Sequence, residues 1–110
     1  MSKTRVMNVR DPAYVSLPDS EKQYIGRAGR GEDGYFGNSH PVGWCQQCER
    51  IHGRGEAVTA FKNEFLNYRL AADTDYVRRV LALKGKTLGC FCAPRSCHGD
   101  VIAEWVDAQP

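Results

Sequence analysis

The fold of this chain is decided by its C-terminal third, where residues 86–106 read KTLGCFCAPRSCHGDVIAEWV. The β-favouring start of this stretch predicts a strand over residues 86–92. The spacing of Val101, Ile102, Trp105 and Val106 places their side chains on one side of a final helix. A strand that leads directly into a helix favours an α/β fold over an all-helical bundle.

Further strands and helices are predicted upstream of this unit. Val58, Phe61, Phe65 and Tyr68 recur at helical spacing and predict an amphipathic helix over residues 56–70. A second helix should begin at a cap formed by Asp73 or Thr74 and end near residues 84–85. Residues 5–9 and 23–26 are expected to form strands. We therefore expect an α/β fold with a short sheet and about three helices.

Length and composition suit one domain that spans residues 1–110. Of the 110 residues, 42% are hydrophobic and 25% are charged, and the formal net charge is only +2. This charge argues against strong nonspecific binding to nucleic acid. No apolar run approaches the roughly 20 residues that span a bilayer, and residues 1–10 lack the apolar core of a signal peptide. We expect a cytoplasmic protein that does not associate with membranes.

A glycine-rich loop carries the first group of candidate ligands. Eight of the eleven glycines lie between residues 26 and 55, which excludes a long regular element there. Cys45, Cys48 and His52 lie in this loop, and two cysteines separated by two residues can both reach one tetrahedral metal ion. A structural zinc would order the loop on binding. We assign Cys92 as the fourth ligand, and the alternatives are a water molecule, a ligand from another chain, or one of three further side chains: Cys90, Cys97 and His98.

Other interpretations of the five cysteines remain open. In a protein without a secretion signal, we expect reduced thiols rather than disulfides. Cys45 and Cys48 could be free thiols or a redox pair. Together with Cys92 and Cys97, they could instead form one four-ligand metal site. An iron–sulfur cluster held by four of the cysteines is a further alternative.

The second group of candidate residues lies where the last strand meets the last helix. We expect Ser96 to cap this helix and Cys97 to lie at its N-terminus, where backbone N–H groups and the helix dipole favour anions. The nearby Arg95 should help lower the pKa of Cys97 and make it the most reactive thiol. Gly99 would let a ligand approach the backbone closely. Cys90 is expected to face the core and to react slowly.

A third segment could complete a binding site. Residues 24–27 and 34–38 combine glycines and aromatic side chains with Arg27, Gly37 and Asn38, as in a ligand-binding loop. Turns and core packing would explain the same glycines and aromatic residues without any ligand.

The order of several short motifs resembles the family called Domain of Unknown Function 4326. The resemblance covers nearly the whole chain, and its motifs are residues 8–10, 24–27, 37–38, 83–86, 89–94 and 97–100. Its most specific part is the Cys-Phe-Cys-Ala-Pro and Cys-His-Gly-Asp ending. It implies an intracellular protein from a bacterium or a phage-infected host, and no known reaction. Ser39 stands where the family commonly has proline, and the group of Cys45, Cys48 and His52 resembles an elaboration found in some members.

Two functions follow from these observations, and the residues leave open whether the protein is an enzyme. In the first, the domain binds a nucleotide or another phosphorylated small molecule between the glycine-rich loop and the Cys97-His98 helix start. Arg27, Gly37, Asn38 and Arg95 would bind the ligand, Cys97 or Cys92 would be a nucleophile or metal ligand, and His98 and Asp100 would carry protons. In the second, it is a noncatalytic zinc-stabilised module that binds a host protein or nucleic acid.

Overall fold

A three-stranded parallel sheet forms the centre of the molecule. A computed structural model of the protein describes residues 3–27, 29, 31–40, 42–46, 48–93, 95 and 97–110. Strands β1 (Arg5–Asn8), β5 (Thr87–Cys90) and β2 (Lys22–Tyr24) lie in the order β1-β5-β2. Val6 of β1 and Gln23 of β2 both pair with Leu88 of β5. All three predicted strands and the α/β class are confirmed.

The predicted helices are also present. Helix α2 (Arg54–Glu64) continues through the π-helical turn η2 (Phe65–Arg69) into α3 (Leu70–Ala72). It begins two residues before the predicted start, since Glu56 accepts a hydrogen bond from the N–H of Gly53. Helix α4 (Thr74–Leu81) is capped by the carboxylate of Asp73, and α5 (His98–Asp107) follows β5. The single-turn elements α1 (Pro12–Val15) and η1 (Asp19–Glu21) are too short for a periodic pattern and were not predicted.

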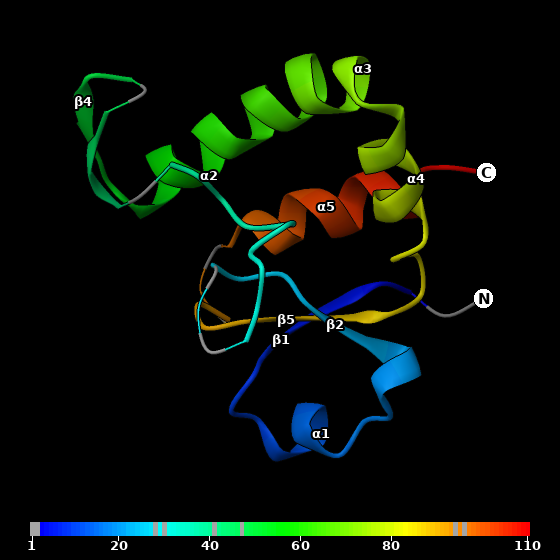
Figure 1. The fold of residues 1–110 in the computed structure, drawn as a ribbon. Helices are drawn as coiled ribbons and strands as arrows, with labels where there is room; N and C mark the ends of the chain where they lie inside the picture. Colours follow the sequence, from blue (N-terminus) through cyan, green and yellow to red (C-terminus); the bar gives the residue numbers. More distant parts are fainter. Residues whose placement is uncertain are drawn as a thin grey trace.

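The helices cover the two faces of the sheet unequally. Helix α5 packs on the sheet and is covered by α2, α3 and α4, whereas α1 lies on the opposite face (Figure 1). The core lies between α5, α2 and the sheet, and its fully buried side chains include Phe61, Phe65, Leu88, Ile102 and Val106. This arrangement fixes the start of α5 beside the carboxyl ends of the strands.

Two glycines allow helices to approach the sheet closely. A Cβ atom at Gly99 would lie 2.6 Å from Cδ1 of Ile25, so α5 can pack here only without a side chain. Gly99 therefore allows close packing in the core. The sequence-based prediction that it lets a ligand approach the backbone is not supported. A Cβ atom at Gly89 would lie 2.3 Å from the hydroxyl oxygen of Tyr14, the buried side chain of α1.

A short hairpin interrupts the glycine-rich loop. Strands β3 (Gly43–Cys45) and β4 (Arg50–His52) pair antiparallel, with Trp44 opposite Ile51. The buried Cys45 and His52 point inward, whereas Trp44 and Ile51 are 59% and 71% exposed. As expected, the loop holds no long regular element within its described residues. Three-residue strands give too little alternation to be predicted from sequence.

Candidate functional site

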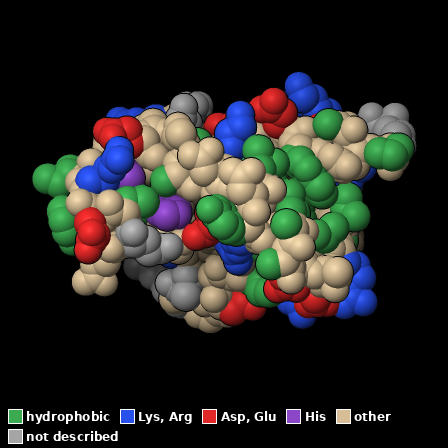
Figure 2. All heavy atoms as spheres, turned by 90° about the horizontal axis from the view of Figure 1, so that it is seen from above, with side chains coloured by type: hydrophobic (Ala, Val, Ile, Leu, Met, Phe, Trp, Pro, Cys, Tyr) green, Lys and Arg blue, Asp and Glu red, His purple; other side chains and the backbone are tan. Residues whose placement is uncertain are grey.

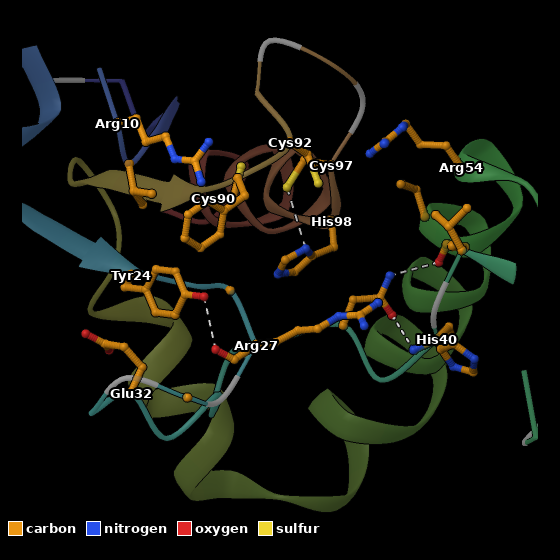
Figure 3. A pocket seen from close by; sticks show the side chains of 18 of the residues that line it. Arg10, Tyr24, Arg27, Glu32, His40, Arg54, Cys90, Cys92, Cys97 and His98 are labelled. Atoms are coloured by element: carbon orange, nitrogen blue, oxygen red, sulfur yellow. Dashed lines mark hydrogen bonds between the residues drawn. The ribbon is translucent and has the colours of Figure 1, made fainter. Parts of the chain in front are cut away.

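A pocket of about 770 Å³ lies at the carboxyl edge of the parallel sheet (Figure 3). Its walls come from the ends of the three strands, the loops that follow β2 and precede β3, and the first turns of α2 and α5. Open parallel sheets bind ligands at this edge. The volume lies in the range of small-molecule sites, which is roughly 300 to 1,000 Å³.

Cationic side chains dominate the charge of this pocket. Among the described residues that line it, Arg10, Lys22, Arg27 and Arg54 carry positive charge, and Glu32 carries the only carboxylate. Arg10 and Arg54 enter from opposite sides (Figure 3). Lys22 donates hydrogen bonds to backbone carbonyls of α1, and Arg10 lies 5.5 Å from the ring centre of Phe91.

The guanidinium groups of Arg27 and Arg54 form no ion pair with any described residue. Both groups line the pocket, so they are the cations most available to an anionic ligand.

The start of α5 is capped by Cys97, which the sequence did not predict. Its sulfur accepts the N–H of Gly99 at 3.4 Å, its carbonyl accepts the N–H of Asp100, and its own N–H donates to the Asp100 carboxylate at 3.1 Å. Ser96, the predicted cap, lies outside the described residues. The backbone N–H groups of Gly99 and Asp100 already donate hydrogen bonds to Cys97. The prediction that these two N–H groups bind an anion is therefore wrong.

His98 is held at the back of the pocket by a short hydrogen bond. Its Nε2 atom lies 2.7 Å from the carbonyl oxygen of Ile25, and its ring packs edge-on against Phe61. Burial lowers the pKa of His98 and favours the neutral ring. The hydrogen bond to Ile25 assigns the proton to Nε2, which leaves the Nδ1 lone pair facing Cys97 Sγ at 3.6 Å.

At the floor of the pocket, Cys90 is the more acidic thiol and Cys97 the less acidic one, which is the opposite of the predicted order. A hydrogen bond from Cys97, helped by backbone N–H groups of Ala93 and Cys92, outweighs burial and lowers the pKa of Cys90 to about 6. The same bond to Cys90, together with burial, raises the pKa of Cys97. The prediction of a Cys97 thiolate is wrong, because Cys97 is only 2% exposed and both the neighbouring Cys90 and burial raise its pKa.

The structure brings only some of the predicted ligand-binding residues into the pocket. Arg27 and Asn38 line it, whereas Arg95 is exposed and lies outside its lining. Asn38 is committed to the fold, because its side chain donates to the carbonyl of Ala57 and accepts the N–H of His40. Gly37 lies in tight contact with the backbone rather than on the pocket wall: a Cβ atom there would be 3.0 Å from the carbonyl oxygen of Gly26.

The predicted catalytic residues are likewise divided. Cys97 and His98 line the pocket side by side, and their catalytic roles stay a prediction. Asp100 lies outside the lining, and its exposed carboxylate caps the helix.

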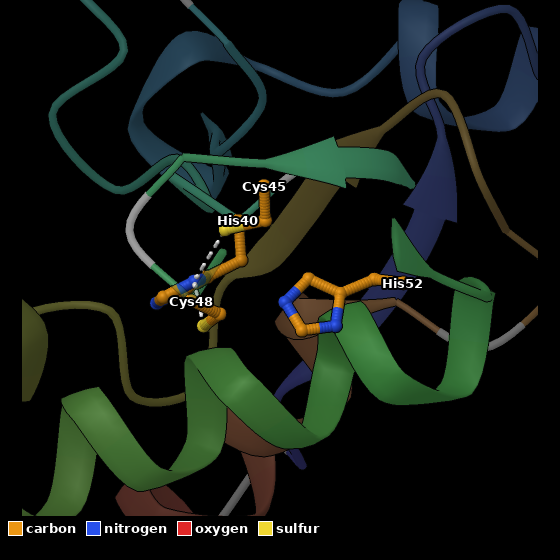
Figure 4. A group of neighbouring side chains, drawn as sticks. All are labelled: His40, Cys45, Cys48 and His52. Atoms are coloured by element: carbon orange, nitrogen blue, oxygen red, sulfur yellow. Dashed lines mark hydrogen bonds between the residues drawn. The ribbon is translucent and has the colours of Figure 1, made fainter. Parts of the chain in front are cut away.

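A second cluster of side chains joins the hairpin to the loop that precedes it. Donor atoms of His40, Cys45, Cys48 and His52 all lie within 4.8 Å of one another (Figure 4). His40 Nδ1 is 3.5 Å from Cys45 Sγ and 3.6 Å from Cys48 Sγ. His52 is only 4% exposed, yet neither of its ring nitrogens has a hydrogen-bond partner among the described residues. This group could hold a metal ion.

The fourth member of the cluster is His40, not Cys92. Cys92 lines the pocket together with Cys90 and Cys97, apart from the hairpin cluster. One tetrahedral site that joins Cys92 and Cys97 to Cys45 and Cys48 is therefore not the arrangement observed among the described residues, and the iron–sulfur cluster stays a prediction. His40 was missed because no short motif links it to Cys45, and only the folded loop brings it close.

His40 connects the cluster to its surroundings. Its Nε2 atom lies 3.5 Å from the Glu64 carboxylate of α2, and its ring also borders the pocket. A hollow beside α2 is lined by His40, Cys48 and His52, and histidine atoms are visible at the bottom of a depression in Figure 2. The cluster therefore lies close to the surface and beside the wall of the pocket.

These features define a small α/β domain with a cationic pocket at the edge of a parallel sheet and an adjacent Cys/His cluster. Residues 8–108 match the model of the family described as "Domain of unknown function (DUF4326)", so the chain belongs to this family. No solved structure matches the chain.

One curated relative is an uncharacterized 12.4 kDa protein in the nrdA-td intergenic region of Enterobacteria phage T4. It is 37% identical over 54 residues, which is 49% of this chain and 49% of the phage protein. The match thus spans about half the length of each protein. Among the described residues, no helix is long and apolar enough to cross a membrane.

Proposed function

We propose that this domain binds a nucleotide or a similar phosphorylated small molecule in the pocket at the carboxyl edge of the sheet. The observation that carries the proposal is the charge of the pocket: four cationic side chains face a single carboxylate among its described lining residues. Arginine forms forked, charge-assisted hydrogen bonds to phosphate. Arg27 and Arg54, which make no ion pair with a described residue, are the groups we assign to the phosphates.

The other side of the pocket suits an aromatic base. Tyr24 and Phe91 meet edge to face with their ring centres 6.1 Å apart, and both line the pocket. Phe91 is 51% exposed, so part of its ring is available for stacking. Stacking of a base on an exposed aromatic ring contributes roughly 1 to 3 kcal/mol in nucleic-acid complexes.

We further propose that the hairpin cluster binds zinc and stabilises one wall of this pocket. Two thiolates and two imidazoles form a donor set typical of a structural, tetrahedral zinc site. Burial opposes ionisation of Cys45, but hydrogen bonds from His40 and Cys48 lower the pKa of Cys45 to about 6 and favour the thiolate that a metal needs. The N–H of His40 bonds to Asn38, so ordering His40 also orders the loop that lines the pocket.

Calorimetric titration with ADP and with adenosine tests the function. ADP should bind and adenosine should bind at least about tenfold more weakly, because only ADP offers charged phosphate oxygens to the arginines. Equal affinity for the two compounds, or no binding of ADP to zinc-loaded protein, would contradict the proposal.

A second candidate function rests on the outer face of the hairpin. Trp44 and Ile51 form an exposed cross-strand pair, and the neighbouring Val42 is 55% exposed. Such a patch favours docking of a host protein or nucleic acid by a noncatalytic module. In that case Trp44→Ala would abolish partner binding and leave binding of ADP unaffected.

A further inference from the structure

We propose that Cys90 and Cys97 form a reactive dithiol pair that exchanges with an anionic disulfide entering the pocket. This activity goes beyond the binding of a phosphorylated ligand and does not require it. It is carried by the position of the two sulfur atoms at the floor of the pocket.

Cys90 and Cys97 come from different elements and face the same pocket. Cys90 ends β5 and Cys97 caps α5, both belong to one buried core cluster, and their side chains lie close together at the pocket (Figure 3). Each residue is only 2% exposed, and both line the pocket. A reagent therefore reaches them through the pocket, and a bond between them joins groups that the fold already holds together.

The surroundings of Cys90 suit the attacking thiolate. The neighbouring Cys97 thiol and the backbone N–H groups of Ala93 and Cys92 lower the pKa of Cys90 to about 6. Several donors directed at one sulfur atom stabilise its negative charge. Cys92 lines the same pocket and serves as the control thiol.

The surroundings of Cys97 suit the resolving thiol. The lone pair of His98 Nδ1 faces its sulfur at 3.6 Å, because the other ring nitrogen is held by the carbonyl of Ile25. His98 can therefore accept the proton of Cys97 when that thiol reacts.

The exchange proceeds in two balanced steps. The Cys90 thiolate attacks one sulfur of a disulfide R–S–S–R, forms the mixed disulfide Cys90–S–S–R and releases one thiolate RS⁻. Cys97 then loses its proton to His98 and attacks the Cys90 sulfur, which forms the Cys90–Cys97 disulfide and releases the second RS⁻. The dithiol is oxidised by two electrons, and the disulfide substrate is reduced to two thiols.

The pocket selects the charge of the substrate. Arg10, Arg27 and Arg54 surround the sulfur atoms, with Arg10 and Arg54 on opposite sides (Figure 3). A disulfide that carries carboxylates, such as glutathione disulfide, is attracted to this site, whereas a disulfide of amines, such as cystamine, is repelled.

The test is incubation of the reduced, zinc-loaded chain with glutathione disulfide, followed by peptide mapping in the absence of any phosphorylated compound. Wild type should lose two thiols and yield a peptide pair linked through Cys90 and Cys97. Cys97→Ser should stop at one glutathione adduct on Cys90, and Cys92→Ser, the matched control, should still form the internal disulfide. Cystamine should react about tenfold or more slowly than glutathione disulfide.

Two results would overturn the inference. One is a wild-type protein whose adducts lie on Cys92 or Cys48 while Cys90 and Cys97 stay unlinked. The other is equal reaction with the anionic and the cationic disulfide, which would remove the assigned substrate class. Mapping of the wild-type chain decides the first point even if a variant does not fold. Failure of ADP to bind would leave both results unchanged, so this test is separate from that of the proposed function.

Discussion

The Nε2 atom of His98 lies 2.7 Å from the carbonyl oxygen of Ile25. This contact ties the first residue of α5 to the residue that follows β2, across 73 positions of the chain. It also fixes the orientation of the imidazole, so that Nδ1 faces Cys97. One hydrogen bond thus holds the imidazole of His98 at the back of the pocket, next to the thiol of Cys97.

The buried His98 should make the protein sensitive to mild acid. Burial lowers the pKa of His98 in the folded protein, whereas an unfolded histidine has a pKa of about 6.5. Below about pH 6.5 the unfolded chain therefore binds more protons, and the free energy of unfolding falls as pH decreases, by at most about 1.4 kcal/mol per pH unit. Denaturant unfolding between about pH 7.5 and about pH 5.5 measures this slope.

His98→Gln provides the comparison, because the glutamine amide can still donate to Ile25 but does not titrate. The free energy of unfolding of the variant should fall less than that of wild type over the same pH range. Both proteins contain the hairpin cluster, so its contribution cancels when the two pH slopes are subtracted. Equal slopes for the two proteins would show that His98 does not carry this pH dependence.

Removing a donor from the hairpin cluster should release the metal and destabilise the fold. Cys48→Ser is expected to lower bound zinc from about one equivalent to nearly none and to lower the melting temperature, because metal binding and loop ordering occur together. Elemental analysis and thermal unfolding measure both effects. Cys92→Ser removes a thiol outside the cluster and should retain the metal; loss of zinc in Cys92→Ser would place Cys92 among the ligands after all.

Glu64 should strengthen metal binding without touching the metal. Its carboxylate lies 3.5 Å from Nε2 of His40, the ring whose Nδ1 faces the two sulfurs. Glu64→Gln is expected to weaken zinc affinity by roughly tenfold, as substitutions behind a metal-bound histidine do. Competition with a chelator measures this affinity, and Glu49→Gln, which removes an exposed carboxylate of the hairpin turn, is the charge-matched control. An equal loss in both variants would mean that only net charge matters.

The acidity of Cys90 should be visible in its rate of alkylation. Because the pKa of Cys90 is lowered to about 6, its thiolate persists at neutral pH and is lost as pH falls below about 6. Cys97, whose pKa is raised, should remain protonated over this range. Alkylation by iodoacetate, mapped by mass spectrometry across pH, should label Cys90 before Cys97; the reverse order would restore Cys97 as the reactive thiol.

The parts of the fold that could be predicted from sequence are those that local patterns determine. The helical spacing of Phe61 and Phe65, the capping side chain of Asp73 and the β-favouring run before Cys90 each act within a few residues. The hairpin of β3 and β4 was not predictable, because each strand has three residues and is ordered by its pairing and by the side chains of the cluster.

The candidate site was harder to predict because tertiary contacts assemble it. Cys45, Cys48 and His52 were found from their spacing, but His40 joins them only in the folded loop. The cap of α5 was assigned to Ser96, since cysteine is an unusual cap, although the sulfur of Cys97 accepts the N–H of Gly99. Sequence also grouped Arg95 with Arg27, whereas Arg95 faces outward and Arg10 and Arg54 line the pocket instead.

Binding of ADP in the pocket is tested most directly by mapping amide chemical shifts of the zinc-loaded protein during a titration with ADP. The largest changes should fall around Gly26, Arg27 and Phe91 at the carboxyl edge of the sheet. ADP binding should weaken about tenfold or more in Arg27→Ala and keep wild-type affinity in Arg95→Ala, which removes an arginine outside the pocket. Changes confined to Trp44 and Ile51 on the outer face of the hairpin, or equal loss of affinity in the two arginine variants, would show that ADP does not bind in this pocket.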